Sequence, residues 1–427
     1  MPKTTTATPE EPDGPKKRKS RGRGRANGEG SIFPYRNGTY AAYVWVTTPA
    51  GDRKRRWVYG KTRAETHEKW LKLHAEASKG VVATKVPALV EYLSYWLEEV
   101  VVPPDFAPLT CSTYETLVRL YIVPGLGKKR LDKLTVRDVR AWLNETRKTC
   151  QCCAQGKDAR RDEKKRRCCA VGKCCERVAS ERTIRDAWTV LRSALSNAIR
   201  EELISKNVAA LVRVSKPRSR KNKPWTVEEA RQFLESARDS GDPLYLAYVL
   251  VLILGLRKGE VLGIPKESID REAAELDVSW QLQRVRRELL HRETKTEASD
   301  AKLPLPALCT AALSAHEARQ EQRKKAAGDD WTETKFLITT RYGTPVDPRN
   351  FNREFTERCR RAGVRLIKVH DTRATCATLL AALDVHPRVA MRILRHAQID
   401  VTMEVYTQAT DEKTVEALKR LGDAFRL

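Results

Sequence analysis

The sequence predicts an α+β protein that is mostly helical and divided into several domains. Short segments rich in β-branched and aromatic residues, separated by turn residues, occur near the N-terminus. Apolar residues at helical spacing dominate residues 86–214, and residues 225–427 mix helical patterns with extended segments. A chain of 427 residues is also too long for one compact domain, so roughly two to four domains are expected.

Composition points to a polyanionic partner. The formal net charge is +26 and the isoelectric point is near 9.7. The longest apolar run, residues 244–256, is shorter than the roughly 18–20 residues that span a bilayer, so we expect no membrane association. The N-terminus carries no apolar signal segment, which favours the cytoplasm, where the eleven cysteines would not form a disulfide framework. Nucleic acid is therefore the favoured partner.

Residues 1–27 contain Pro, Thr, Gly and charged residues and a basic run, a composition that predicts disorder. One interpretation is a solubilising tail. The other is an arm that follows phosphates or enters a minor groove, with Arg23 and Arg25 of the alternating Arg-Gly run as contacts.

Residues 28–80 predict a small sheet with one helix. Strands are expected at 31–34, 39–47 and 53–59, and a helix at 63–78. The strands place basic residues beside aromatic ones. Either the aromatic residues form the core and the charges a solvated face, or part of this surface lies in a major groove. The candidate DNA contacts are Arg53, Arg55 and Arg56.

Residues 86–214 read as a helical domain. Helices are expected at 90–101, 110–121, 135–148 and 180–201, the third after a Thr cap. Pro103-Pro104 and Pro124-Gly125 are expected to end the first two helices.

A cysteine-rich insertion, residues 150–175, interrupts this domain between basic residues. Its spacing matches no common finger, yet the clustering is typical of paired knuckles around a structural zinc ion. Redox-labile thiols in a disordered loop are the alternative. The candidate ligands are Cys150, Cys152, Cys153, Cys168, Cys169, Cys174 and Cys175.

Residues 215–224 form a basic linker, with Arg218, Arg220 and Lys221 as candidate DNA contacts. Thr226 should cap the first helix of the C-terminal domain, residues 225–427.

Within that domain, a buried apolar helix ends at Gly255 and then presents Arg257. Glu260, one turn further on, would orient the Arg257 guanidinium. Residues 276–286, 294–296 and 301–305 predict one sheet, which would place Lys295 at a hairpin tip. Taken alone, Arg257 could simply complement a helix dipole and Lys295 could be a surface lysine.

The stretch 367–407 carries His370, Arg373, His396 and Tyr406 on a helical pattern. A phenol can attack phosphorus, a guanidinium can hold two phosphate oxygens, and an imidazole can move protons. Such a set suits phosphoryl transfer through a protein nucleophile. The last residues, 411–427, predict a final amphipathic helix.

These residues resemble the signature of the tyrosine recombinases, the family of phage integrases and chromosome-dimer resolvases. His-x-x-Arg matches residues 370–373, and Leu-Gly-His matches residues 394–396, with Arg395 in place of the usual Gly. The nucleophile matches Tyr406, the upstream Arg matches Arg257, and the hairpin Lys matches Lys295.

The resemblance implies that Arg257 and Arg373 bracket the scissile phosphate and His396 donates to a non-bridging oxygen. His370 would act as acid or base near Tyr406, and Lys295 would protonate the departing 5′-oxygen. Catalysis would need neither ATP nor a cofactor. The product of cleavage would be a 3′-phosphotyrosine.

The same resemblance implies an arm-binding domain at 28–80, a core-binding domain at 86–214 and a catalytic domain at 225–427. Partners would be double-stranded DNA at attachment and arm sites, and a homotetramer whose C-terminal tails dock on neighbours. A host DNA-bending or excision factor could assist. The protein would act on the nucleoid of a bacterium. The cysteine-rich insertion and the basic tail favour an actinobacterial phage or integrative element as its source.

Two other functions stay open at this point. A type IB topoisomerase shares the Arg, Lys, His and Tyr chemistry, and a DNA-binding regulator could carry an inactive site.

Overall fold

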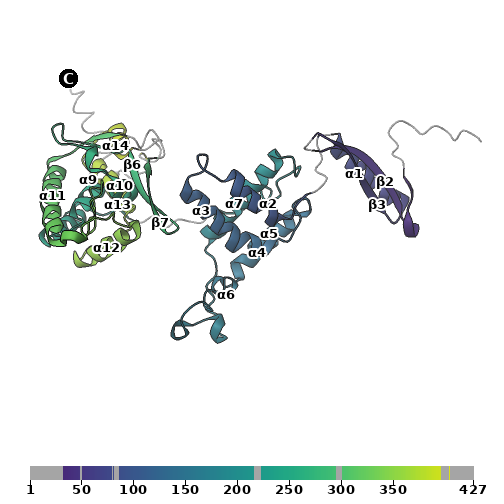
Figure 1. Ribbon diagram of the computed structural model, residues 1–427, viewed down its shortest axis with the longest axis horizontal. Coiled ribbons are helices and arrows are strands. Elements are labelled where there is room, and N and C mark those ends of the chain that lie inside the picture. Colours follow the sequence, from purple (N-terminus) through teal and green to yellow (C-terminus); the bar gives the residue numbers. More distant parts are fainter. Residues whose placement is uncertain are drawn as a thin grey trace, which may run out of the picture. The chain divides into compact units, whose positions relative to one another are not determined.

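The computed structural model describes residues 32–48, 51–78, 80, 86–215, 223–294, 301–395 and 403 (Figure 1). Two compact units divide the chain. One contains the residues up to Trp96 together with Leu117–Ser215, and the other contains Leu97–Thr116 together with the residues from Lys216 onward. The fold is α+β and mostly helical, as predicted.

The N-terminal part is a three-stranded antiparallel sheet with one helix along it (Figure 1). The turn before the second strand uses Asn37 and Gly38, both at positive φ, where Asn and Gly are least strained. Ala42, Val44 and Val46 pack on Trp70 and Leu73 of the helix. The elements are β1 (Phe33–Pro34), β2 (Tyr40–Thr47), β3 (Arg53–Gly60) and α1 (Arg63–Ala77), close to the predicted ranges.

The helical part is built as predicted at two of its helix starts. Thr135 and Asp138 form a reciprocal capping box, and Ser180 accepts a hydrogen bond from the Thr183 N–H. Tyr92 donates its O–H to Ala194 O, which ties the first helix to the last. The elements are α2 (Leu89–Tyr95), the π turn η2 (Trp96–Val100), α3 (Pro108–Leu117), the π turn η3 (Val118–Ile122), α4 (Val123–Leu126), α5 (Val136–Lys148), α6 (Gln151–Ala154) and α7 (Glu181–Arg200).

The prediction that Pro124-Gly125 ends a helix is wrong. The chain stays helical to Leu126. The π turn η3 is followed directly by the short helix α4, and Pro124 lies in the first turn of α4. A proline there loses no helical hydrogen bond. Gly125 serves packing instead, since a Cβ at this position would lie 2.4 Å from Trp142 Cδ1.

The C-terminal domain begins at the Thr226 cap, whose side chain accepts from the Glu229 N–H as predicted. Its helices are α8 (Val227–Asp239), α9 (Tyr245–Ile253), α10 (Lys258–Gly263), α11 (Ala307–Ala327), α12 (Pro348–Arg361), α13 (Asp371–Ala382) and α14 (Pro387–Leu394). Its strands are β4 (Ile269–Asp270), β5 (Glu275–Asp277), β6 (Trp280–Val285), β7 (Glu288–Glu293) and β8 (Lys302–Pro304).

The predicted single sheet of this domain is also wrong for the described residues. β4, β5 and β8 form one antiparallel sheet, whereas β6 and β7 pair with each other as a separate hairpin. Arg286 at positive φ makes the turn of that hairpin. Strand β7 was not predicted, because the polar residues His291 and Arg292 interrupt its run of apolar residues.

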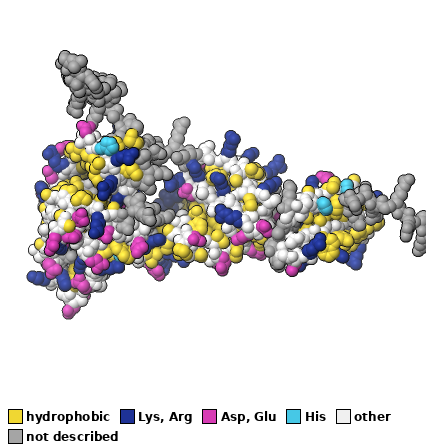
Figure 2. All heavy atoms as spheres, turned by 90° about the horizontal axis from the view of Figure 1, so that it is seen from above, with side chains coloured by type: hydrophobic (Ala, Val, Ile, Leu, Met, Phe, Trp, Pro, Cys, Tyr) yellow, Lys and Arg dark blue, Asp and Glu magenta, His cyan; other side chains and the backbone are white. Residues whose placement is uncertain are grey.

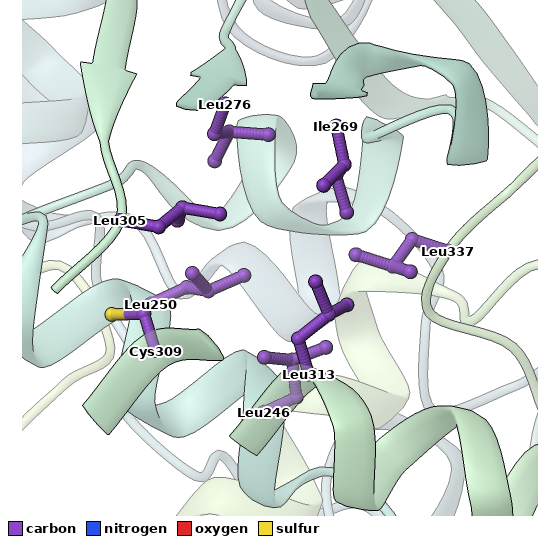
Figure 3. Close-up of a pocket in the computed structure, with 8 residues that line it drawn as sticks. All are labelled: Leu246, Leu250, Ile269, Leu276, Leu305, Cys309, Leu313 and Leu337. Atoms are coloured by element: carbon purple, nitrogen blue, oxygen red, sulfur yellow. The ribbon is translucent and has the colours of Figure 1, made fainter. Parts of the chain in front are cut away.

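The core of this domain surrounds α9, which is buried along nearly its whole length. Between α9, α11 and the β4-β5-β8 sheet lies a small pocket lined by Leu246, Leu250, Ile269, Leu276, Leu305, Cys309, Leu313 and Leu337 (Figure 3). These apolar side chains place no acid, base or cation at the pocket, so it is a packing void rather than a reaction site.

Short 3₁₀ turns complete the structure: η1 (Arg36–Gly38), η4 (Leu131–Lys133), η5 (Glu163–Lys165), η6 (Cys169–Val171), η7 (Lys266–Ser268) and η9 (Gly328–Asp330). Among the described helices, none has the length and apolar character needed to cross a membrane. Figure 2 shows Lys and Arg side chains, interspersed with Asp and Glu, over the described surface.

Candidate active site

The site forms where α9 ends against α13 and α14. Gly255 follows α9 at φ +57, and a Cβ there would lie 2.7 Å from Leu394 Cδ2 and 3.3 Å from Cys376 Sγ. Only glycine combines this backbone conformation with so close an approach. The glycine therefore brings three helices together next to the candidate arginines.

Arg257 caps the start of α10 and is held by Glu260. The Arg257 backbone N–H donates to Glu260 Oε2 at 2.7 Å, and Arg257 Nη1 donates to Oε1 at 2.7 Å. Glu260 is only 4% exposed, whereas the Arg257 side chain is 40% exposed. The buried carboxylate thus orients a guanidinium that still reaches solvent.

Arg373 lies one turn into α13 and is 6% exposed. Its Nη1 donates to Gly255 O at 2.6 Å, which links α13 to the end of α9. Burial, together with the charges of Arg257 and Arg395, lowers the pKa of Arg373 to about 9. The guanidinium is still protonated at neutral pH, so it is a buried cation in a region already rich in positive charge.

Arg395 joins the same cluster from the end of α14. It sits at φ +53, is 3% exposed, and donates from Nη2 to Glu260 Oε2 at 2.7 Å. Its Nε and Nη1 are buried and have no hydrogen-bond partner among the described residues. Arg395 was not among the site residues expected from the sequence. The signal for it was the basic side chain at the position where the resemblance places Gly.

His370 stands at the start of α13, with an exposed side chain. It lies one helical turn before Arg373, so the two share the N-terminal end of one helix. Other predicted site residues lie outside the described residues: Lys295, His396, Tyr406, Arg23, Arg25, Arg218, Arg220 and Lys221. The predicted final helix at 411–427 lies outside them as well.

The N-terminal sheet has one covered and one open face. Residues paired across β2 and β3 share a face, so Arg53 and Arg55 lie with Thr47 and Trp45 on the side away from α1. The Arg55 guanidinium stacks on this face over Tyr43 at 4.9 Å and Trp45 at 4.8 Å.

Arg56 differs from Arg53 and Arg55, because it pairs with Val44 and therefore lies on the face of the sheet that α1 covers. The aromatic residues of the open face are exposed and do not form the core: Trp45, Trp57 and Tyr59. The interpretation that places these aromatic residues in the core is therefore wrong.

In the cysteine-rich insertion, six of the seven predicted thiols gather. The sulfurs of Cys150, Cys153, Cys168 and Cys174 lie within 4.8 Å of one another, and so do those of Cys152, Cys168 and Cys175. Cys169 is exposed and belongs to neither set.

Asp158 organises the loop that carries Cys168. The carboxylate accepts hydrogen bonds from the backbone N–H groups of Arg167, Cys168 and Ala170, and from Arg161. Burial raises the pKa of Asp158, but these donors outweigh it and lower the pKa to about 2. An ionised, fully buried carboxylate therefore holds the backbone of residues 167–170 in place.

Two family models match the chain. Residues 224–413 match the phage integrase family, and residues 88–146 match the phage integrase N-terminal SAM-like domain. An integrase of Saccharopolyspora erythraea is 23% identical over 93% of this chain and 97% of its own length. An integrase of Streptomyces ambofaciens is 24% identical over 85% of this chain and 88% of its own length.

Solved structures show the same fold. The Tn1549 transposon integrase in complex with a circular intermediate DNA superposes with a TM-score of 0.57 at 20% identity, over 79% of this chain and all of that one. A lambda integrase dimer bound to a core site gives a TM-score of 0.50 at 17% identity, over 91% and 99% of the two chains.

The matched regions include the arginine cluster on α10 and α13 and the helices before it. The chain therefore belongs to the phage integrase family of tyrosine recombinases, enzymes that cleave and rejoin DNA strands.

Proposed function

We propose that this chain integrates a phage or other mobile element into a bacterial chromosome by site-specific recombination, with Tyr406 as nucleophile. The observation that carries the proposal is the arginine cluster. Arg257 and Arg373 are far apart in sequence, yet both meet at the end of α9, one through Glu260 and the other through Gly255 O. Fixed guanidiniums at one point suit a phosphodiester.

In the proposed step, the Tyr406 oxygen attacks phosphorus and forms a 3′-phosphotyrosine while the bond to the 5′-oxygen breaks. Arg257 and Arg373 stabilise the negative charge on the non-bridging oxygens, with His396 as a further donor. His370 takes the phenolic proton, and Lys295 gives a proton to the 5′-oxygen. Attack by a partner strand's 5′-hydroxyl reverses the step, so bond energy is conserved. The family needs no cofactor for this chemistry.

The proposed partner is double-stranded DNA. Two solved structures with the same fold are integrases bound to DNA, and the open face of the β1–β3 sheet carries Arg53 and Arg55 beside exposed aromatic rings. We assign that face to accessory arm sites and the helical domain to the core site. The proposal extends to a homotetramer on two duplexes, an assisting host bending or excision factor, and a cytoplasmic location on the nucleoid.

The test uses nicked duplexes that carry a candidate attachment site, with denaturing electrophoresis as the readout. We expect a protein–DNA adduct that survives denaturation and carries a 3′-phosphotyrosine. The adduct should disappear in Tyr406→Phe.

Tyr342→Phe is the matched control, because Tyr342 is an exposed tyrosine of the same domain outside the cluster. An adduct that persists in Tyr406→Phe would place the nucleophile elsewhere. Relaxation of supercoiled DNA by the protein without strand exchange would support the topoisomerase instead.

We also propose that the cysteine-rich insertion holds structural zinc. The four sulfurs of Cys150, Cys153, Cys168 and Cys174 lie close enough for one tetrahedral ion. The thiolate set fits zinc, and a metal would cross-link a loop that contains little apolar core.

Elemental analysis of the purified chain should find zinc, and a strong chelator should lower the melting temperature. Cys153→Ser should reproduce the chelator's effect, whereas Cys169→Ser should not, because Cys169 lies outside both sets. A metal-free chain with an unchanged melting temperature would exclude a structural ion.

A further inference from the structure

The thiols of the insertion exceed the needs of one ion. Four sulfurs form one set, but Cys152 and Cys175 form a second set with Cys168, which belongs to both. Cys168 is fully buried at the centre of the cluster. Cys150 belongs to the first set, and its sulfur lies 4.0 Å from the shared Cys168 and 3.7 Å from Cys175 of the second set.

We propose that the insertion binds two zinc ions in one thiolate cluster, bridged by the sulfurs of Cys150 and Cys168. Cys153 and Cys174 are the terminal ligands of one ion, and Cys152 and Cys175 are those of the other. The inference rests on the structural zinc proposed above, and it specifies how many zinc ions the insertion binds and which cysteines bind each ion. Six thiolates can complete two four-coordinate ions only if two of them are shared.

The distances fit this arrangement. With Zn–S bonds near 2.3 Å, two sulfurs on one tetrahedral ion lie about 3.8 Å apart. The sulfur–sulfur distances are 3.3 Å for Cys153–Cys168, 3.7 Å for Cys150–Cys175 and 4.0 Å for Cys150–Cys168, on both sides of that value.

The backbone around the sulfurs also suits thiolates. The Cys175 N–H donates to Cys168 Sγ at 3.1 Å, and the Glu176 N–H donates to Cys174 Sγ at 3.3 Å. Such donors stabilise charged sulfur. Six thiolates and two divalent ions leave two negative charges, and the insertion that holds them is rich in basic residues, of which Arg161 interacts with Cys152.

The test is the metal content of the full chain, measured by native mass spectrometry after expression with zinc and again with cobalt. We expect two ions per chain. Cys152→Ser removes a terminal ligand of one ion only, so it should lower the content to one. Cys169→Ser should leave two.

A content of one ion per chain, both in the unaltered chain and in Cys152→Ser, would overturn the two-ion cluster and support a single structural zinc. No ion at all would overturn both proposals. The count on the unaltered chain decides the matter even if a serine variant fails to fold.

A second inference is carried independently by Arg395. Arg257 and Arg395 donate to the two oxygens of one buried carboxylate, Glu260, and the charges of both arginines act on the nearby Arg373. Arg373 and Arg395 are each more than nine-tenths buried. A phosphodiester carries one negative charge, whereas its pentacovalent transition state carries two. A further cation at this point therefore stabilises the transition state more than the ground state.

We infer that Arg395 is a positioning residue that holds Glu260 and adds a buried positive charge beside Arg373. The inference rests on the proposed DNA cleavage. Because the charge is matched to the transition state, loss of Arg395 should slow cleavage and leave DNA affinity nearly unchanged.

Arg395→Gly tests this, since glycine accepts φ +53 without strain. We expect single-turnover adduct formation to fall on the order of 100-fold, with less change in DNA affinity. Arg392→Ala, an exposed arginine of the same helix, is the control and should cleave normally. On a methylphosphonate DNA, whose transition state has one charge fewer, the defect of Arg395→Gly should shrink.

The role of Arg395 would be overturned if Arg395→Gly slowed cleavage of phosphodiester and methylphosphonate DNA equally. It would also be overturned if the variant lowered only the affinity for DNA. A readout without DNA is the rise in melting temperature with inorganic phosphate, which should be smaller for Arg395→Gly than for the unaltered chain. An equal rise would also overturn it. Failure of the unaltered chain to form any adduct would count against the recombinase proposal instead.

Discussion

Glu260 is the residue on which the arginine cluster depends. Its two oxygens accept from Arg257 Nη1 and Arg395 Nη2, and the carboxylate is almost fully buried. A buried cation that loses its anion has neither water nor charge to replace it. The carboxylate is therefore a structural requirement of the cluster as well as an orienting group.

Glu260→Gln should destabilise the C-terminal domain by about 3–5 kcal/mol, because Arg395 would remain buried without a counter-charge. Urea unfolding of the full chain measures the loss. Glu229→Gln is the control. Glu229 pairs with Arg365 at 2.8 Å on the surface, where such pairs contribute less than about 1 kcal/mol. Similar losses in the two variants would contradict the central role of Glu260.

At the scale of elements, the end of α9 determines where the site forms. Gly255 has a left-handed backbone conformation, and its carbonyl oxygen accepts a hydrogen bond from Arg373. The side chains of Leu394 and Cys376 pack against its Cα. A longer α9 or a bulkier residue would push α13 and α14 away and carry Arg373 and Arg395 with them. Helix packing thus decides the distance between the guanidiniums.

Gly255→Ala should cost about 1–2 kcal/mol for the left-handed backbone and a further 1–3 kcal/mol or so for overpacking. Gly241→Ala is matched to it, since Gly241 has φ +64 but nothing within 4 Å of its Cβ position. Gly241→Ala should pay only the backbone cost. Calorimetric melting of both variants separates the two effects, and equal shifts would mean that the contact with Leu394 is unimportant.

At the scale of the whole molecule, positive charge is spread along the chain, but each domain presents it differently. The C-terminal domain concentrates it in a buried cluster, whereas the N-terminal sheet exposes Arg53 and Arg55 beside aromatic rings. A buried cluster suits chemistry on one phosphate. An open basic face suits contact with many phosphates.

Binding to arm-site duplexes should therefore respond to Arg55→Ala and much less to Arg56→Ala, which lies on the helix side. Loss of one phosphate contact should reduce the slope of log K against log salt concentration by about 0.9. Fluorescence anisotropy over a salt series measures both slopes. A larger effect from Arg56→Ala would show that the other face of the sheet binds DNA.

Much of this structure could be predicted from local sequence. The caps at Thr135 and Thr226 each begin a helix as expected, because a capping hydrogen bond involves only neighbouring residues. The predictions that failed involve partners far away in the chain. Gly125 is a packing contact with Trp142 rather than a helix end, and β6 pairs with the overlooked β7.

The order and spacing of Arg257, His370, Arg373 and Tyr406 were enough to identify the family, since a motif is a property of the chain. Folding was needed to show that Arg395 shares Glu260 with Arg257, and that Cys168 lies in two sets of thiols while Cys169 lies in none. Both facts depend on the direction in which a side chain points after distant segments pack. Spacing along the chain does not contain that information.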